Sequence, residues 1–168
     1  KKNLRTILRP TEWQVISRAV RNHANCTCEI CGRPVDRAAQ LDCHEKWEYK
    51  KVKVPGKKKK IRIQRLVDLQ AVCTQCHAVK HIGFSAHRGN YENCVDWFME
   101  KNGASYKEFR ECEKKAWKKF EKRSRHKWKI DISLLPEILK NKGILNMDED
   151  TEVDISSLYR DHLSQVYI

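Results

Sequence analysis

Four cysteines constrain this chain more than any other feature of its sequence. Cys28 and Cys31 form one pair with two residues between them, and Cys73 and Cys76 form a second pair with the same spacing. This spacing lets a tight turn direct two sulfur atoms at one ion, and two such turns complete the tetrahedral shell of a structural zinc site. Because 168 residues with 40% hydrophobic content support one modest domain, we expect the zinc to hold the fold together.

Other uses of the cysteines are open to a chain of this kind. A single Cys-x-x-Cys pair would suit a redox couple, and eight cysteines would suit disulfides in a secreted protein, but two pairs around a histidine-rich segment favour thiolates on metal. Cys26 competes with Cys28 for the zinc, although it lacks the two-residue spacing to Cys31. Cys94 and Cys112 fall on apolar faces of expected helices, where a cysteine usually packs in the core.

The charge of the chain is uneven. Residues 1–130 hold 32 Lys and Arg against 14 Asp and Glu, whereas residues 131–168 hold 3 against 8. The basic part is typical of a surface that binds phosphate backbones, although an anionic membrane surface would attract it equally. No apolar stretch approaches the length of a membrane span and no signal-peptide core is evident, so we expect an intracellular, cytoplasmic protein with no membrane partner.

The local pattern predicts a helix followed by a β-hairpin. A helix over residues 11–23 would begin at Thr11, with Gln14 completing its capping box. Gly32, directly after the first cysteine pair, suits the tight turn that a metal knuckle needs. Strands are expected over residues 40–54 and 61–67, on either side of a Pro-Gly turn and four lysines at positions 57–60.

Three further helices are expected after the hairpin. One opens near Thr74 and carries the second cysteine pair, one covers residues 90–102 and stops at Gly103, and one begins at Ser105 with Glu108 in its capping box. The apolar stripe of the last helix is expected in the core and consists of Phe109, Cys112, Ala116 and Phe120.

Two basic surfaces and one acidic segment bear on binding. The lysines at positions 57–60 form the hairpin tip, and the outward face of the last helix carries Lys114, Lys115, Lys118, Lys119 and Lys122. Each group either contacts phosphates or only keeps the surface solvated. Residues 144–168 are acidic and would bind a protein partner, compete for the basic groove, or be poorly ordered.

The segment between the cysteine pairs carries the motif that points to a reaction. It contains Leu-Asp-Cys-His-Glu at positions 41–45 and Asp-Leu-Gln-Ala-Val-Cys-Thr-Gln-Cys-His-Ala-Val-Lys-His at positions 68–81. Over residues 26–82 this order resembles the zinc-stapled HNH endonuclease family. The resemblance implies a ββα-metal fold, in which two strands and a helix clasp one divalent metal, and it implies phosphodiester hydrolysis.

The resemblance also implies roles for individual residues. His44 takes the place of the general base, which an imidazole suits because its unperturbed pKa is about 6.5. His77 takes the place of a metal ligand on the helix, and His81, one helical turn later, can face the same ion. Cys43 takes the position of a further ligand, and Asp68 takes that of the residue that orients the base.

Two of these residues depart from the family pattern. The family has Asp or His where this chain has Cys43, and a thiolate there would shift the preferred metal from Mg²⁺ toward Zn²⁺ or similar ions. The family has Asn where this chain has Asp68, which can still accept a hydrogen bond from His44 or raise its pKa. Catalytic Zn²⁺, Mg²⁺ and Mn²⁺ all remain candidates.

Together these features predict an α+β protein with a small zinc-stabilised core and flanking helices. We expect a helical segment over residues 1–25, an HNH-like domain over 26–82, a basic helical region over 83–130 and an acidic tail over 131–168. The expected function is metal-dependent endonucleolytic cleavage, of double-stranded DNA by the resemblance, in a prokaryotic or phage-infected cell. The alternative is a catalytically degenerate module that binds nucleic acid or docks on a larger complex.

Overall fold

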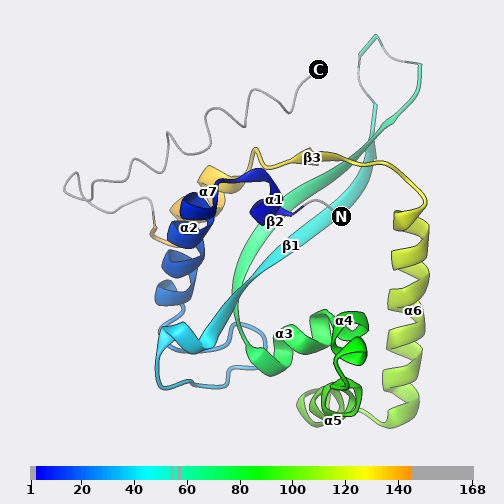
Figure 1. The fold of residues 1–168 in the computed structure, drawn as a ribbon. Helices are drawn as coiled ribbons and strands as arrows, with labels where there is room; N and C mark the ends of the chain where they lie inside the picture. The colour runs from blue at the N-terminus through cyan, green and yellow to red at the C-terminus, as the bar shows by residue number, and fades with distance from the viewer. Residues whose placement is uncertain (1–2, 54, 57, 145–168) are drawn as a thin grey trace, which may run out of the picture.

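The computed structural model describes residues 3–53, 55–56 and 58–144, which form a mixed α+β fold (Figure 1). The elements along the chain are α1 (Leu4–Ile7), α2 (Pro10–His23), η1 (Ala38–Gln40), β1 (Leu41–Val52), β2 (Ile61–Cys73), α3 (Thr74–Lys80), α4 (Ile82–His87), α5 (Tyr91–Asn102), α6 (Tyr106–Ser124), β3 (Lys129–Asp131) and α7 (Leu135–Asn141). The predicted α+β class is therefore confirmed.

A long antiparallel hairpin of β1 and β2 forms the centre of the molecule. Its register pairs Leu41 with Cys73 at the base and Val52 with Ile61 near the tip, and β3 joins the other edge of β2 in parallel. The second strand was expected to end at residue 67 but continues to Cys73, because most of its last residues are buried in the core. This longer strand leads the chain directly from the sheet into α3.

The tip of the hairpin agrees with the turn expected there. Gly56 adopts a positive φ of 76°, a conformation that glycine accepts without strain. Lys58, Lys59 and Lys60 are exposed beside it, while Val54 and Lys57 lie outside the described residues. The exposed tip therefore carries positive charge away from the core.

The first long helix begins one residue earlier than expected. Pro10 is its first residue, which suits proline because a helix leaves the first N–H without a partner. The capping box uses Glu12, whose Oε2 accepts a hydrogen bond of 2.7 Å from the backbone N–H of Arg9, and not the predicted pair of Thr11 and Gln14. Pro10 and Glu12 together define the start better than Thr11 does.

The two helices after α4 match the predicted ends but not the predicted core. Gly103 ends α5 at a φ of 57°, and Ser105 and Glu108 form the predicted capping box of α6. Cys94 is buried as expected, whereas Cys112 is exposed. In Figure 1, α6 leaves α5 and runs alongside the hairpin, so only the start of its apolar stripe, at Phe109, is buried.

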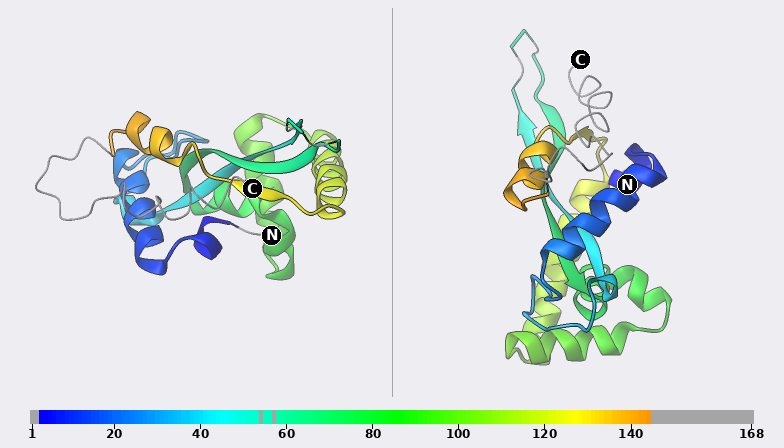
Figure 2. Two further views of the ribbon diagram at one scale, coloured as in Figure 1. Left: turned by 90° about the horizontal axis from the view of Figure 1, so that it is seen from above. Right: turned by 90° about the vertical axis from the view of Figure 1, so that its left-hand side faces the viewer.

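One core joins the N-terminal helices, the hairpin, the cysteine knuckles and α7. α2 and α7 lie on opposite sides of the hairpin base (Figure 2), and Ile16, Leu66 and Leu139 are all fully buried in the same cluster. Residues 131–144 of the acidic segment thus belong to this core, while residues 145–168 of the expected tail lie outside the described residues. None of the described helices combines the length and apolar character needed to cross a lipid bilayer.

Candidate metal centres and the surrounding groove

The four cysteines of the two predicted knuckles meet in one cluster. The Sγ atoms of Cys28, Cys31, Cys73 and Cys76 all lie within 4.8 Å of one another, and all eight cysteines are free thiols. Cys31 and Cys73 are 3.9 Å apart between sulfurs, close to the roughly 3.8 Å expected for a tetrahedron with Zn–S bonds of about 2.3 Å. The cluster can therefore hold a metal ion such as zinc.

Local backbone geometry aims these sulfurs. In the first knuckle Gly32 adopts a φ of 71° and donates from its N–H to the carbonyl of Cys28, as the expected turn requires. Burial acts to raise the pKa of the Cys28 thiol, but hydrogen bonds from backbone groups of Cys31 and Cys73 outweigh it and lower that pKa to about 7. A thiolate is the form that binds metal, and these hydrogen bonds favour it at Cys28, whereas burial raises the pKa of the Cys73 and Cys76 thiols.

The second knuckle opens α3 and is enclosed by α5. The Sγ of Cys73 accepts from the N–H of Cys76 at the start of the helix. The indole N–H of Trp97 donates to the Sγ of Cys76 at 3.3 Å, and Lys101 lies 4.6 Å from the ring of Trp97. A donor and a cation thus accompany the negative charge that four thiolates would carry.

Three histidines form a second cluster at the surface of the molecule. The ring nitrogens of His44, His77 and His81 all lie within 4.8 Å of one another, with His44 and His77 partly exposed and His81 exposed. The rings meet edge to face, with centroids 4.8 Å apart between His77 and His81 and 5.2–5.5 Å from either ring to His44. Imidazole nitrogens at this separation can bind one transition-metal ion.

The histidines come together because a strand and a helix meet at the base of the hairpin. His44 lies on β1, and His77 lies on α3, which follows directly from the end of β2. Although α3 ends at Lys80, the N–H of His81 still donates to the carbonyl of His77, so the two residues keep helical spacing. The structure thus brings these three predicted site residues together.

Asp42 is a member of this site that the sequence reasoning missed. Its Oδ2 lies 2.9 Å from Nδ1 of His77, and the hydrogen bond with His77 is the largest cause that holds the pKa of Asp42 below its usual range. An ionised Asp42 would accept the Nδ1 proton and leave Nε2 of His77 as the ligand atom. The signal for it was its position two residues before His44, on the same face of the strand.

The surroundings keep His44 neutral. Burial is the main cause that lowers its pKa to about 4, and the charges of His81, His77 and Lys80 lower it further. Near neutral pH the ring therefore has an unprotonated nitrogen that is able to bind a metal or accept a proton.

The expectation that Cys43 joins the histidines is not met. Adjacent residues on a strand point to opposite faces, so Cys43 turns away from the face of His44 and lies in the hydrophobic core, 7% exposed. Burial, followed by the charge of Glu45, raises the pKa of its thiol to about 12. Cys43 is therefore part of the core and lies outside the histidine cluster.

The structure also does not bring Asp68 to His44. The register places Gln70 opposite His44, and an irregularity at Lys46/Trp47 shifts the pairing beyond it. The Oδ1 of Asp68 accepts from the backbone N–H of Leu69 and lies 4.0 Å from Nζ of Lys142. Asp68 therefore lies beside Lys142, which follows α7, and not at the histidine cluster.

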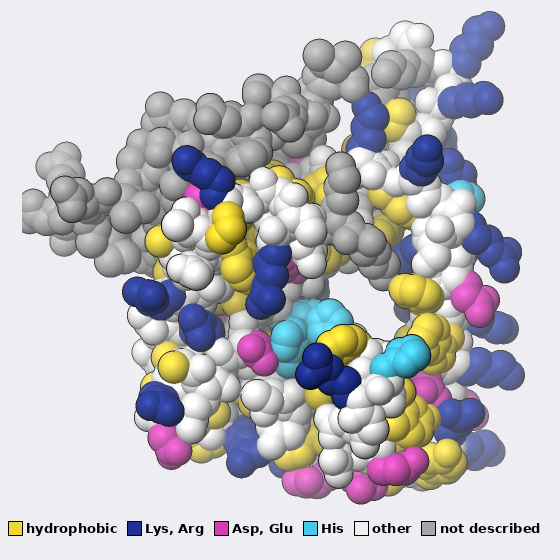
Figure 3. Space-filling model, viewed as in Figure 1, with side chains coloured by type: hydrophobic (Ala, Val, Ile, Leu, Met, Phe, Trp, Pro, Cys, Tyr) yellow, Lys and Arg dark blue, Asp and Glu magenta, His cyan; other side chains and the backbone are white. Residues whose placement is uncertain are grey.

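The histidine cluster opens into a groove of about 830 Å³. Its walls come from α1, α2, the hairpin, α3, α4 and the end of α6, with Arg5, Lys80, Arg88 and Arg123 among the residues that line it. Figure 3 shows the histidine side chains beside an opening, with Lys and Arg side chains nearby. Glu45 is the one acidic residue among the lining residues described. Its carboxylate accepts hydrogen bonds from the N–H of Leu4 and the indole N–H of Trp47.

No family model, curated protein or solved structure matches this chain. The two clusters and the groove are therefore the features that bear on its function.

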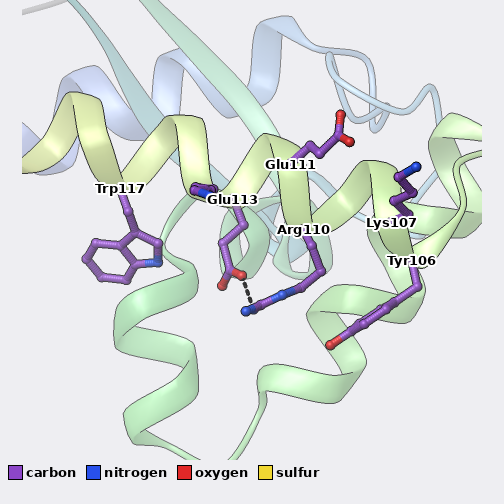
Figure 4. Close-up of a pocket in the computed structure, with 7 residues that line it drawn as sticks. Tyr106, Lys107, Arg110, Glu111, Glu113 and Trp117 are labelled. Atoms are coloured by element: carbon purple, nitrogen blue, oxygen red, sulfur yellow. Dashed lines mark hydrogen bonds and ion pairs between the residues drawn. The ribbon is translucent and has the colours of Figure 1, made fainter.

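A second hollow, of about 750 Å³, lies on α6 and is a weaker candidate for a functional site. Figure 4 shows Arg110 and Glu113 pointing toward each other within it, joined by an ion pair. The hydroxyl of Tyr91 contacts both of these residues, so the polar groups of this hollow join α5 to α6. None of the histidines that cluster at the hairpin base lines it.

Proposed function

We propose that the chain is a metal-dependent endonuclease of the HNH type, which hydrolyses phosphodiester bonds of nucleic acid, with DNA favoured by the resemblance. The observation that carries this proposal is the meeting of His44, His77 and His81 within 4.8 Å in an open, basic groove. A cluster with solvent access leaves coordination positions open for substrate, which a closed four-thiolate shell does not.

The donor atoms fit a divalent transition metal. His77, oriented by Asp42, and His81 offer two imidazole ligands on the same side of the groove, and imidazole suits Zn²⁺, Ni²⁺ or Cu²⁺ better than Mg²⁺. When bound, such a metal would polarise the phosphate and stabilise the departing oxygen. With Cys43 in the core, no thiolate enters this ligand set.

His44 supplies the general base in this proposal. Its neutral ring accepts a proton from the attacking water as the bond between phosphorus and a bridging oxygen breaks. Lys80, which adjoins the cluster on α3, neutralises part of the phosphate charge. The role of the four-cysteine cluster, with zinc bound, is structural. It holds the knuckle of residues 28–31 against the start of α3.

The test compares the wild type with His44→Ala on plasmid DNA and on RNA, with Zn²⁺, Ni²⁺, Mn²⁺ or Mg²⁺ added. We expect wild-type cleavage with a transition metal, and a loss of about 10²- to 10⁴-fold in His44→Ala without a change in circular dichroism. His87→Ala, an exposed histidine on α4 outside the cluster, is the matched control. Absence of wild-type cleavage with every metal, or full cleavage by His44→Ala, would contradict the proposal.

A further inference from the structure

Three arginines around the histidine groove share one arrangement. In each case the guanidinium lies against an aromatic ring, and both members of each pair line the same groove. The distances from guanidinium carbon to ring centroid are 5.4 Å for Arg5 on Trp13, 4.8 Å for Arg88 on Phe84 and 4.1 Å for Arg123 on Tyr49. Such contacts restrain long side chains and so reduce the entropy that they lose when a ligand binds.

The three arginines come from three separate parts of the chain. Arg5 lies on α1, Arg88 directly follows α4, and Arg123 lies in the last turn of α6. None of them lies in residues 26–82, where the motif is found. The flanking segments, which carry no motif of their own, thus complete the groove.

The position of Arg123 depends on contacts of α6 with its neighbours. Its carbonyl accepts from the indole N–H of Trp128 at 2.8 Å, and Trp128 packs edge to face on Tyr49. Earlier in α6, Trp117 lies so close to Gly83 of α4 that a Cβ at Gly83 would be 2.9 Å from the indole. These contacts hold the end of α6 over the part of the groove that β1 lines.

These arginines form no ion pair within the described structure, although the charge of Arg5 helps to lower the pKa of Asp42. Other arginines are paired, as Arg65 is with the buried Asp131 at 2.5 Å and Arg110 with Glu113. Within residues 3–53, 55–56 and 58–144, no ion pair joins Arg5, Arg88 or Arg123 to a carboxylate at 4.0 Å or less. Three restrained guanidiniums around one groove are suited to an anionic ligand with several charges.

We propose that Arg5, Arg88 and Arg123 clamp the phosphates of a single nucleic-acid strand and hold it across the histidine cluster. This inference rests on the proposed nuclease function, because it names the form of its substrate. A groove of about 830 Å³ has the size of a site for one small ligand, and so accommodates a short stretch of one strand at the histidine cluster. Phe84, 62% exposed at the groove, offers a ring on which an unpaired base stacks.

The experiment measures binding without cleavage. In a His44→Ala background, fluorescence anisotropy follows a labelled single-stranded oligonucleotide and a duplex of the same length. We expect each of Arg5→Ala, Arg88→Ala and Arg123→Ala to weaken single-strand binding about tenfold, and to reduce the salt dependence of the affinity by about one phosphate contact. Duplex binding should fall less.

Arg18→Ala is the control, because Arg18 is exposed on α2 and its loss removes the same charge outside the groove. The corresponding lysine variants should recover part of the affinity, since they restore charge without the planar guanidinium. Circular dichroism of each variant checks the fold. The clamp is refuted if the groove variants bind single strands as Arg18→Ala does, or if duplex binding falls as much or more.

These outcomes separate the clamp from the nuclease proposal. A wild type that cleaves nothing, combined with weaker strand binding by the arginine variants, would reject the nuclease and retain a single-strand binding groove. Cleavage that needs His44 but arginine variants that bind like Arg18→Ala would retain the nuclease and reject the clamp.

Discussion

The four-cysteine and three-histidine clusters meet at one peptide bond, between Cys76 and His77, yet their surroundings differ. Three of the four cysteines are buried and one is partly exposed, and the indole of Trp97 covers the sulfur of Cys76. The histidines are partly or fully exposed and open into a basic groove. Successive residues on α3 point about 100° apart, so one short helix serves both a closed site and an open one. Under the proposed function, the first site supports the fold and the second meets the substrate.

The largest expected effect is loss of the closed site. Cys76→Ser removes one of four thiolates, so zinc should be lost and the knuckle should detach from α3, with the thermal unfolding transition broadened or absent. His77→Ala should remove only the metal of the open site and keep a cooperative transition. Metal content by mass spectrometry and circular dichroism melts measure both. A folded Cys76→Ser variant, or an unfolded His77→Ala variant, would contradict the assignment of a structural role to the closed site alone.

The contrast also explains what the sequence could predict. The cysteine knuckles were predictable because two-residue spacing and the turn at Gly32 are local constraints on metal geometry. The meeting of His44 with His77 followed from the order of strand and helix in the motif. The three arginines of the groove carry no local signal, since α1, α4 and α6 bring them together only through tertiary packing.

The errors around the histidines have a physical cause in the sheet. The resemblance predicts Cys43 as a ligand because the family has a metal ligand directly before the base, whereas alternation along β1 sends Cys43 and His44 to opposite faces. The same alternation puts Asp42 beside His77. The pairing of β1 with β2 is irregular at Lys46/Trp47, and the sequence gives no signal of this irregularity. Asp68 lies next to it, near Lys142.

An intermediate effect, on metal affinity, is expected from substitution of Asp42. Its size would show how much Asp42 contributes to the open site. Asp42→Asn keeps the shape but removes the carboxylate that orients the His77 ring through Nδ1, so metal affinity should fall about 10- to 100-fold. Competition with a chromogenic chelator measures this affinity. Asp96→Asn, an exposed aspartate on α5, is the control. Equal affinity in both variants would mean that Asp42 does not orient the ligand.

The smallest effect is expected at Trp97, which tests how the closed site is protected. Trp97→Phe keeps most of the ring but removes the N–H that donates to the sulfur of Cys76, so zinc should remain bound yet leave about three- to tenfold faster. Zinc release to excess chelator, followed by absorbance, gives this rate. Trp47→Phe is the matched control. This variant removes an indole N–H that donates to Glu45, away from the cysteines. If both variants release zinc equally fast, the hydrogen bond to sulfur contributes nothing, and burial alone separates the closed site from the open one.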